Sequence, residues 1–203
     1  MKAHRLTPME EPTRRSMPSG RGGLYAFMAG EHAHLDELLD KGASEAKAID
    51  TEAYERFRER LLRHIRIEER ILLPMAQRKR GQALPVAARL RLDHGALAAL
   101  LMLPPTVRTF GAVRVALDEH NALEEVEGGV YDQCESLAGS EIDELLAQIA
   151  ATPRVRASRW VDSPNVVTAA QRALMRAGYD PGLLEPSVGA SRWRSTARIY
   201  RPV

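Results

Sequence analysis

The chain has 203 residues, of which 44% are hydrophobic and 5% aromatic, and its net charge is +2 at pH 7. This length supports one domain with a small extension, and few aromatic residues beside abundant Ala, Leu, Glu and Arg favour an all-α fold over a sheet. The single cysteine excludes an internal disulfide framework, and without a membrane-length apolar run or a hydrophobic signal core we expect a cytoplasmic protein with no membrane association.

Composition divides the chain into three regions. Residues 1–23 are rich in Pro, Gly, Ser and Arg and lack apolar periodicity, so they predict a flexible N-terminal arm. Residues 24–138 carry the periodicity of a helical bundle, and residues 139–203 form a C-terminal extension that ends in an Arg-rich tail. Residues 152–203 hold nine Arg against three acidic residues, and the arm holds five basic against two acidic residues. An acidic domain is therefore expected between two basic ends.

The middle region contains four stretches of helical periodicity, at residues 24–41, 51–80, 85–103 and 106–137. Thr51 is a plausible N-cap for the second helix, and Pro85 suits the first position of the third. Pro74 should kink the second helix, and Gly128-Gly129 is a weak point in the fourth. Short connections between long helices predict antiparallel neighbours, and therefore an up-down-up-down four-helix bundle.

Each predicted helix places one histidine on its apolar stripe, and these are His32, His64, His94 and His120. In the second and fourth helices a glutamate, Glu68 or Glu124, follows the histidine by four residues and shares its face. Burying imidazole and carboxylate groups among aliphatic side chains is costly unless a partner satisfies them. A hydrogen-bonded core histidine would explain any one position. It does not explain six side chains with a repeated spacing.

Metal binding explains the set. Neutral imidazole and carboxylate groups together suit Fe, Mn or Zn. Two inward glutamates need cations to stay ionised, and carboxylates in helical bundles commonly achieve this by bridging two ions. Four imidazole nitrogens and four carboxylate oxygens are fewer donors than the roughly twelve positions of two octahedral ions. Bridging oxygens or waters would fill the remainder, which leaves room for a small exogenous ligand.

Four segments, EHAHLDELL, HIRIEERILLP, DHGALAALL and HNALEEVEGGVYD, resemble the successive helices of the hemerythrin-like, or HHE cation-binding, domain family. The resemblance covers about residues 24–138 and implies a four-helix bundle with a non-haem di-iron centre. It assigns six ligands, with the two glutamates as candidate bridges: His32, His64, Glu68, His94, His120 and Glu124. Oxygen-carrying hemerythrins add a histidine one turn after the third-helix ligand, where this chain has Ala98. The difference argues against simple reversible oxygen carriage and leaves one iron under-coordinated.

Several neighbouring polar residues are expected to play lesser roles. His34 should face solvent on the first helix, and Glu69 and Glu125 should point outward and pair with Arg residues. Tyr25 and Tyr131 fall on the inner stripe, either as core tyrosines with solvated hydroxyls or as hydrogen-bond donors to a metal-bound oxygen species. The lone cysteine is expected to be a packed or surface thiol.

The C-terminal extension predicts two short helices. One covers residues 140–150 with Ser140 as its cap, and the other covers residues 163–178 with Ser163 as its cap and an apolar face that could dock on the bundle or on a partner. The last stretch, GASRWRSTARIYRPV, interleaves Arg with aromatic residues, a pattern that can bind nucleic acid. Because no nucleic-acid module is evident, we prefer a tail that folds back onto the acidic bundle.

These observations favour a di-iron protein that binds, senses or reacts with O₂, peroxide or nitric oxide. The alternative is an iron store or an iron-dependent interaction module without catalysis, and a third reading is a bundle that holds zinc or no metal. The sequence leaves enzymatic turnover open. The expected partners are a small gaseous or peroxide ligand and a protein that contacts the C-terminal tail; nucleic acid is not expected.

Overall fold

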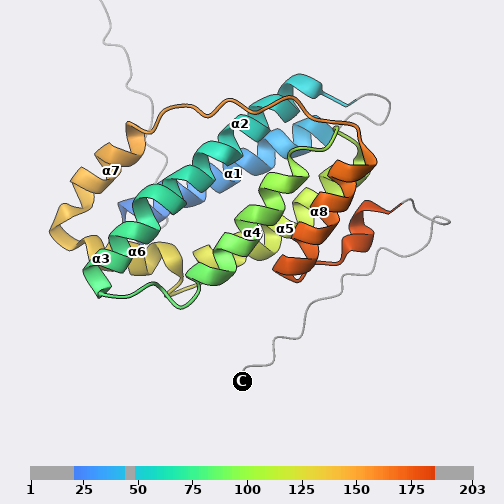
Figure 1. The fold of residues 1–203 in the computed structure, drawn as a ribbon. Helices are drawn as coiled ribbons and strands as arrows, with labels where there is room; N and C mark the ends of the chain where they lie inside the picture. The colour runs from blue at the N-terminus through green and yellow to red at the C-terminus, as the bar shows by residue number, and fades with distance from the viewer. Residues whose placement is uncertain (1–20, 44–48, 186–203) are drawn as a thin grey trace, which may run out of the picture.

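The computed structural model describes residues 21–43 and 49–185, and every regular element in these ranges is a helix. The main helices of the bundle are α1 (Gly23–Ala43), α2 (Thr51–Ile67), α3 (Leu73–Arg80), α4 (Ala87–Leu100) and α5 (Val107–Glu125) (Figure 1). The π-helix η1 (Glu68–Leu72) joins α2 to α3, and α6 (Val130–Ala138) follows α5. The all-α prediction is confirmed, and the up-down-up-down order stays a prediction.

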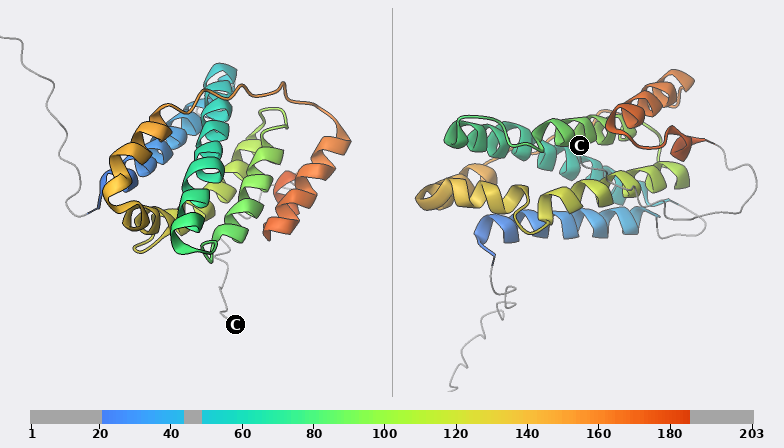
Figure 2. Two further views of the ribbon diagram at one scale, coloured as in Figure 1. Left: turned by 60° about the vertical axis from the view of Figure 1, so that its left-hand side comes forward. Right: turned by 90° about the horizontal axis from the view of Figure 1, so that it is seen from below.

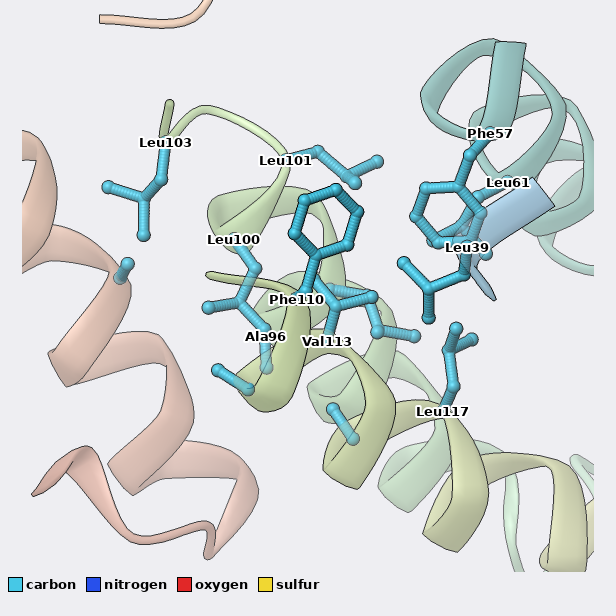
Figure 3. Close-up of a cluster of buried hydrophobic side chains, with 14 of the residues drawn as sticks. Leu39, Phe57, Leu61, Ala96, Leu100, Leu101, Leu103, Phe110, Val113 and Leu117 are labelled. Carbon is cyan, nitrogen blue, oxygen red and sulfur yellow. The ribbon is translucent and has the colours of Figure 1, made fainter. Parts of the chain in front are cut away.

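Buried apolar side chains form two clusters with a polar layer between them. The first cluster includes Leu39, Phe57, Leu61, Leu100, Val113 and Leu117 (Figure 3) and also Leu35 and Leu97. The second cluster includes Leu24, Met28, Ile67, Leu72, Leu90, Val130, Tyr131 and Cys134. On α1, α2 and α4 a predicted metal-binding histidine separates residues of one cluster from residues of the other. The apolar periodicity therefore builds a core that the histidines divide.

Two helix starts differ from the sequence prediction. The N-cap of α2 is Asp50, whose side chain accepts a hydrogen bond from Ala53 N at 2.9 Å, so Thr51 is the first helical residue rather than the cap. An aspartate one residue earlier has the extended backbone that a cap requires. Pro85 lies in the turn before α4 and not at its first position, because the amide of Ala87 donates to the Leu84 carbonyl and closes that turn first.

The helical run 51–80 leaves α geometry just before Pro74. In η1 the amide of Leu73 donates to the carbonyl of Glu68, five residues earlier, as in a π-helix. A proline has no amide hydrogen, and its ring crowds the carbonyl four residues before it. The wider π turn accommodates Pro74 without ending the run, and α3 ends at the left-handed Gly81. The kink predicted at Pro74 is therefore found as a π segment at residues 68–72.

The weak point predicted in the fourth helix is a complete break. The chain leaves α5 after Glu125 and begins α6 at Val130. Gly128 has a positive φ of 72°, and a Cβ on Gly129 would lie 2.6 Å from the carbonyl oxygens of Glu124 and Val126. Because only glycine fits both conditions at low cost, the pair allows the chain to turn here.

The C-terminal extension packs along the bundle. It contains α7 (Ile142–Ala150) and α8 (Pro164–Ala177), with short 3₁₀ turns at η2 (Gly139–Glu141) and η3 (Pro181–Leu184). Ser140 lies inside η2 and does not cap α7, whereas Ser163 and Gly178 occupy the predicted ends of α8. Between these helices the chain crosses α2 and reaches α8, which lies beside α4 (Figures 1 and 2).

A fully buried arginine holds the segment between α7 and α8 against the bundle. Arg58 Nε donates to the Leu101 carbonyl at 2.9 Å, and its Nη2 donates to the Ser158 carbonyl at 2.5 Å. The apolar face predicted for α8 docks on the bundle through Ala170 and Leu174, while Met175 is exposed. The N-terminal arm up to residue 20 and the Arg-rich tail from residue 186 lie outside the described residues. No helix within 21–43 and 49–185 combines the length and apolar character needed to cross a bilayer.

Candidate metal centre

The six predicted ligands come together in the polar layer between the two apolar clusters. Each has at most 4% of its surface exposed. They come from five elements: His32 from α1, His64 from α2, Glu68 from η1, His94 from α4, and His120 and Glu124 from α5. Their donor atoms form two overlapping groups that share both glutamates.

The His32 group consists of His32, His64, Glu68 and Glu124, with one donor atom of each within 4.8 Å of the others. The Nε2 atoms of the two histidines are 2.9 Å apart, and Oε1 of Glu68 is 3.0 Å from His64 Nε2. Oε2 of Glu124 is 3.4 Å from His32 Nε2. Two ligands at right angles, each roughly 2.0–2.2 Å from an ion, are about 2.8–3.1 Å apart. These separations suit one shared divalent cation.

The His94 group consists of His94 and His120 with the same two glutamates. Oε2 of Glu68 is 3.0 Å from His94 Nε2, and Oε2 of Glu124 is 3.3 Å from His120 Nε2. Glu68 thus faces one group with each of its oxygens, which is how a bridging carboxylate is placed. The two groups could hold two adjacent cations.

Unpartnered atoms in the layer fit this interpretation. Four buried atoms, one from each member of the His94 group, have no hydrogen-bond partner among the described residues: Glu68 Oε2, His94 Nε2, His120 Nε2 and Glu124 Oε1. A buried polar atom left unsatisfied costs about 1–3 kcal/mol. One cation at this position would satisfy all four atoms.

The ionisation of the glutamates also supports a cation in this layer. Burial, followed by the neighbouring Glu68 carboxylate, raises the pKa of Glu124 to about 8. Burial also acts to raise the pKa of Glu68, but His64 and His94 outweigh it and hold that pKa well below its usual value. Burial acts to lower the pKa of His94, but the neighbouring carboxylates of Glu68 and Glu69 outweigh it and raise that pKa to about 10. Without a cation, protons must balance the charges that these side chains bring into the core.

A family model described as the hemerythrin HHE cation binding domain matches residues 23–127, just over half of the chain. The chain belongs to the hemerythrin HHE family. The predicted family is therefore confirmed, and together with the two His/Glu groups it indicates a metal-binding protein. Neither the comparison with curated proteins nor that with solved structures produced a match. The match includes all six residues of the two groups and ends before α6.

This hemerythrin-domain protein supports two of its histidines with outer carboxylates that the sequence prediction misplaced. Oε1 of Glu125 accepts from His32 Nδ1 at 2.5 Å, and Oε1 of Glu69 accepts from His94 Nδ1 at 2.7 Å. Both were expected to point outward; Glu69 does contact Arg91, but its other oxygen faces the histidine. A carboxylate on Nδ1 fixes the tautomer in which Nε2 is free to bind a metal.

The outer carboxylates follow a repeated pattern. In both HxxxEE segments the first glutamate belongs to the donor groups and the second reaches a histidine on another helix. Asp93, directly before His94, is fully buried, accepts from Arg89 Nε at 2.9 Å and lies 3.9 Å from His120 Nδ1. That last separation is too long for a hydrogen bond but close enough for charge attraction.

Removing one outer carboxylate should weaken metal binding while leaving the proposed ligands in place. We expect Glu125→Ala to lower metal affinity by about 10- to 100-fold, since His32 loses the group that orients its ring, and Glu125→Gln to lower it less. A chelator competition measures both. The control is Glu37→Ala, which removes the partner of the exposed His34, 3.4 Å away. Equal affinities in Glu125→Ala and the control would show that Glu125 has no orienting role.

The remaining residues divide between surface and core. His34 is exposed, as predicted. Tyr25 is half-buried and stacks under Arg21, 4.2 Å from the guanidinium carbon, so its ring belongs to the outer wall of the second cluster. Cys134 is a packed thiol, and burial raises its pKa to about 12, which makes it unreactive. For Tyr131 the structure excludes the first of the two expected roles, because its hydroxyl is buried and lies 2.7 Å from both Glu68 and Glu124.

Proposed function

We propose that this protein holds two non-haem irons in the His32 and His94 groups and that the centre binds, senses or reacts with O₂, peroxide or nitric oxide. The observation that carries the proposal is the sharing of Glu68 and Glu124 between two complete donor groups. The six proposed ligands are His32, His64, Glu68, His94, His120 and Glu124. A pair of irons supplies redox chemistry and open coordination positions for such small molecules.

Each side chain has a distinct task in this proposal. The four imidazoles would hold the metal through Nε2, and Glu68 and Glu124 would be shared between its two positions. Glu69 and Glu125 keep the Nδ1 protons of His94 and His32 in place through their hydrogen bonds. The two apolar clusters exclude water from the layer on both sides, which strengthens the electrostatic attraction between the carboxylates and the cations.

The donor set favours iron over softer metals. It contains nitrogen and carboxylate oxygen, and its two groups contain no thiolate. Such a set suits Fe, Mn and Zn, and the oxygen-rich shared edge suits a pair of ions better than an isolated tetrahedral zinc. Metal analysis of protein purified without chelator distinguishes the three.

A ligand titration of the iron-loaded protein tests the proposed reactivity. The half-buried Ala98 follows His94 by one turn, where the oxygen-carrying relatives add a histidine, so one iron should keep an exchangeable position. We expect azide and nitric oxide to shift the visible spectrum, and Ala98→His to weaken the shift by supplying a further imidazole. A wild-type spectrum that ignores azide, nitric oxide and peroxide would overturn the reactive proposal.

Iron storage or an iron-dependent interaction is the second candidate. The nearly complete burial of all six proposed ligands favours it, since a closed centre suits retention better than exchange. In that case iron should stabilise the fold and change the binding of a protein partner to the C-terminal tail, without a spectral response to small ligands. The same titration therefore separates the two candidates.

A further inference from the structure

Tyr131 is not one of the six proposed ligands, but its hydroxyl lies among the donor atoms of one group. It is fully buried on α6, beyond the residues that the family model matches. Its hydroxyl is 2.7 Å from Glu68 Oε1 and 2.7 Å from Glu124 Oε2. The same oxygen is 3.0 Å from Nε2 of His32 and 3.4 Å from Nε2 of His64. All four contacts are to members of the His32 group, and the two glutamates also belong to the His94 group.

The Tyr131 oxygen is a close neighbour of all four donors of the His32 group, at 2.7 to 3.4 Å. Three separations among these four donors are 2.9, 3.0 and 3.4 Å. Donors about 2.0–2.2 Å from one ion and at right angles to each other are about 2.8–3.1 Å apart. The hydroxyl is therefore placed as a fifth donor for the same cation.

We propose that Tyr131 is a direct ligand, as phenolate, of the metal held by His32 and His64. This inference rests on the proposed function, since it needs a metal in the His32 group. The oxygen–metal bond replaces the O–H bond, the proton leaves to solvent, and no electron is transferred. In the metal-free layer the hydroxyl donates to the two glutamates, and a cation would take the place of that proton.

The two metal positions are then unequal. The His32 group has five side-chain donors with Tyr131, whereas the His94 group has four, with no further His, Cys, Asp or Glu among the described residues. The Tyr131 contacts that make this difference are confined to one side of the shared glutamates. The exchangeable position for a small molecule therefore belongs to the His94 group, on the helix that carries Ala98.

Phenolate bound to ferric iron gives the test its readout, a charge-transfer absorption in the visible and enhanced phenolate ring modes in resonance Raman spectra. The whole chain is loaded with ferrous iron and oxidised with air. We expect the wild type to show both features and Tyr131→Phe to lose them while keeping bound iron. The control is Tyr54→Phe, since Tyr54 is also fully buried but packs in the first cluster against Phe57, 6.1 Å between ring centroids. That variant should keep both features.

Ferric wild-type protein without phenolate modes, or identical bands in Tyr131→Phe, overturns the inference. If the variant does not fold, wild-type protein labelled with ring-deuterated tyrosine decides, because the modes must shift on labelling if a tyrosine is bound. Iron bound without phenolate features overturns only the role of Tyr131. A chain that binds no iron overturns the di-iron proposal as well.

Discussion

Replacing Glu68 by Ala is expected to reduce the metal content from about two ions per chain to fewer than one. One oxygen of Glu68 faces each donor group, so the substitution removes a ligand from both positions together. It also leaves two cations facing each other with only Glu124 between them, and the repulsion should expel at least one. Metal analysis after purification without chelator gives the stoichiometry directly. Glu124→Ala should behave in the same way.

The matched control is Glu59→Ala, on the outer side of the same helical run and outside both donor groups. It should retain the wild-type metal content. Circular dichroism of all three variants shows whether the bundle has formed, so that loss of metal is not confused with loss of fold. Full metal loading of Glu68→Ala would contradict a bridging role for this residue.

Removing the metal is expected to lower the free energy of unfolding by several kcal/mol. The bare layer keeps two carboxylates and four imidazoles together in the core, with buried donor atoms that have no hydrogen-bond partner among the described residues. Metal that binds only the folded chain adds its binding free energy to stability. Thermal unfolding of metal-loaded and metal-free protein at neutral pH measures the difference, which should appear as a clearly higher melting temperature for the loaded form.

A variant that cannot bind metal provides the comparison. Glu68→Ala combined with Glu124→Ala should melt at one temperature whether or not metal is supplied. Acidification should bring the loaded wild type toward its metal-free melting temperature, because protons compete with the metal for imidazole and carboxylate groups. Equal melting temperatures for loaded and metal-free wild type would contradict the expected stabilisation.

Helical periodicity was sufficient to bring the six donor residues to one place in the prediction. His32 and His64 each occupy a position where the spacing of apolar residues calls for a core side chain, and Glu68 follows one turn later on the same face. Such a spacing is a local property of one helix. The family resemblance then supplied their proposed roles as metal ligands, which the sequence alone could not assign.

Outer contacts were harder to predict because they depend on how neighbouring helices are placed. Glu125 lies one residue beyond the inner glutamate, so its direction follows from the end of α5, and its partner is on α1. The repeated EE in HIRIEE and HNALEE was the available clue, since a purely solvated acid has no reason to recur there. Periodicity placed Tyr131 on the inner stripe, but its contacts with Glu68 and Glu124 depend on how α6 packs after the break at Gly128-Gly129.

Dividing the core has a consequence for motion. In most bundles the central turns are the slowest to exchange their amide hydrogens, because opening them requires global unfolding. Here the central turns carry the polar layer, and the two apolar clusters are joined through it. Without the cation, the central turns need the least free energy to open locally, while the apolar clusters on both sides stay packed. Hydrogen exchange should therefore be fastest around His64 and His94 in the metal-free protein, and cation binding should restore the protection of a continuous core.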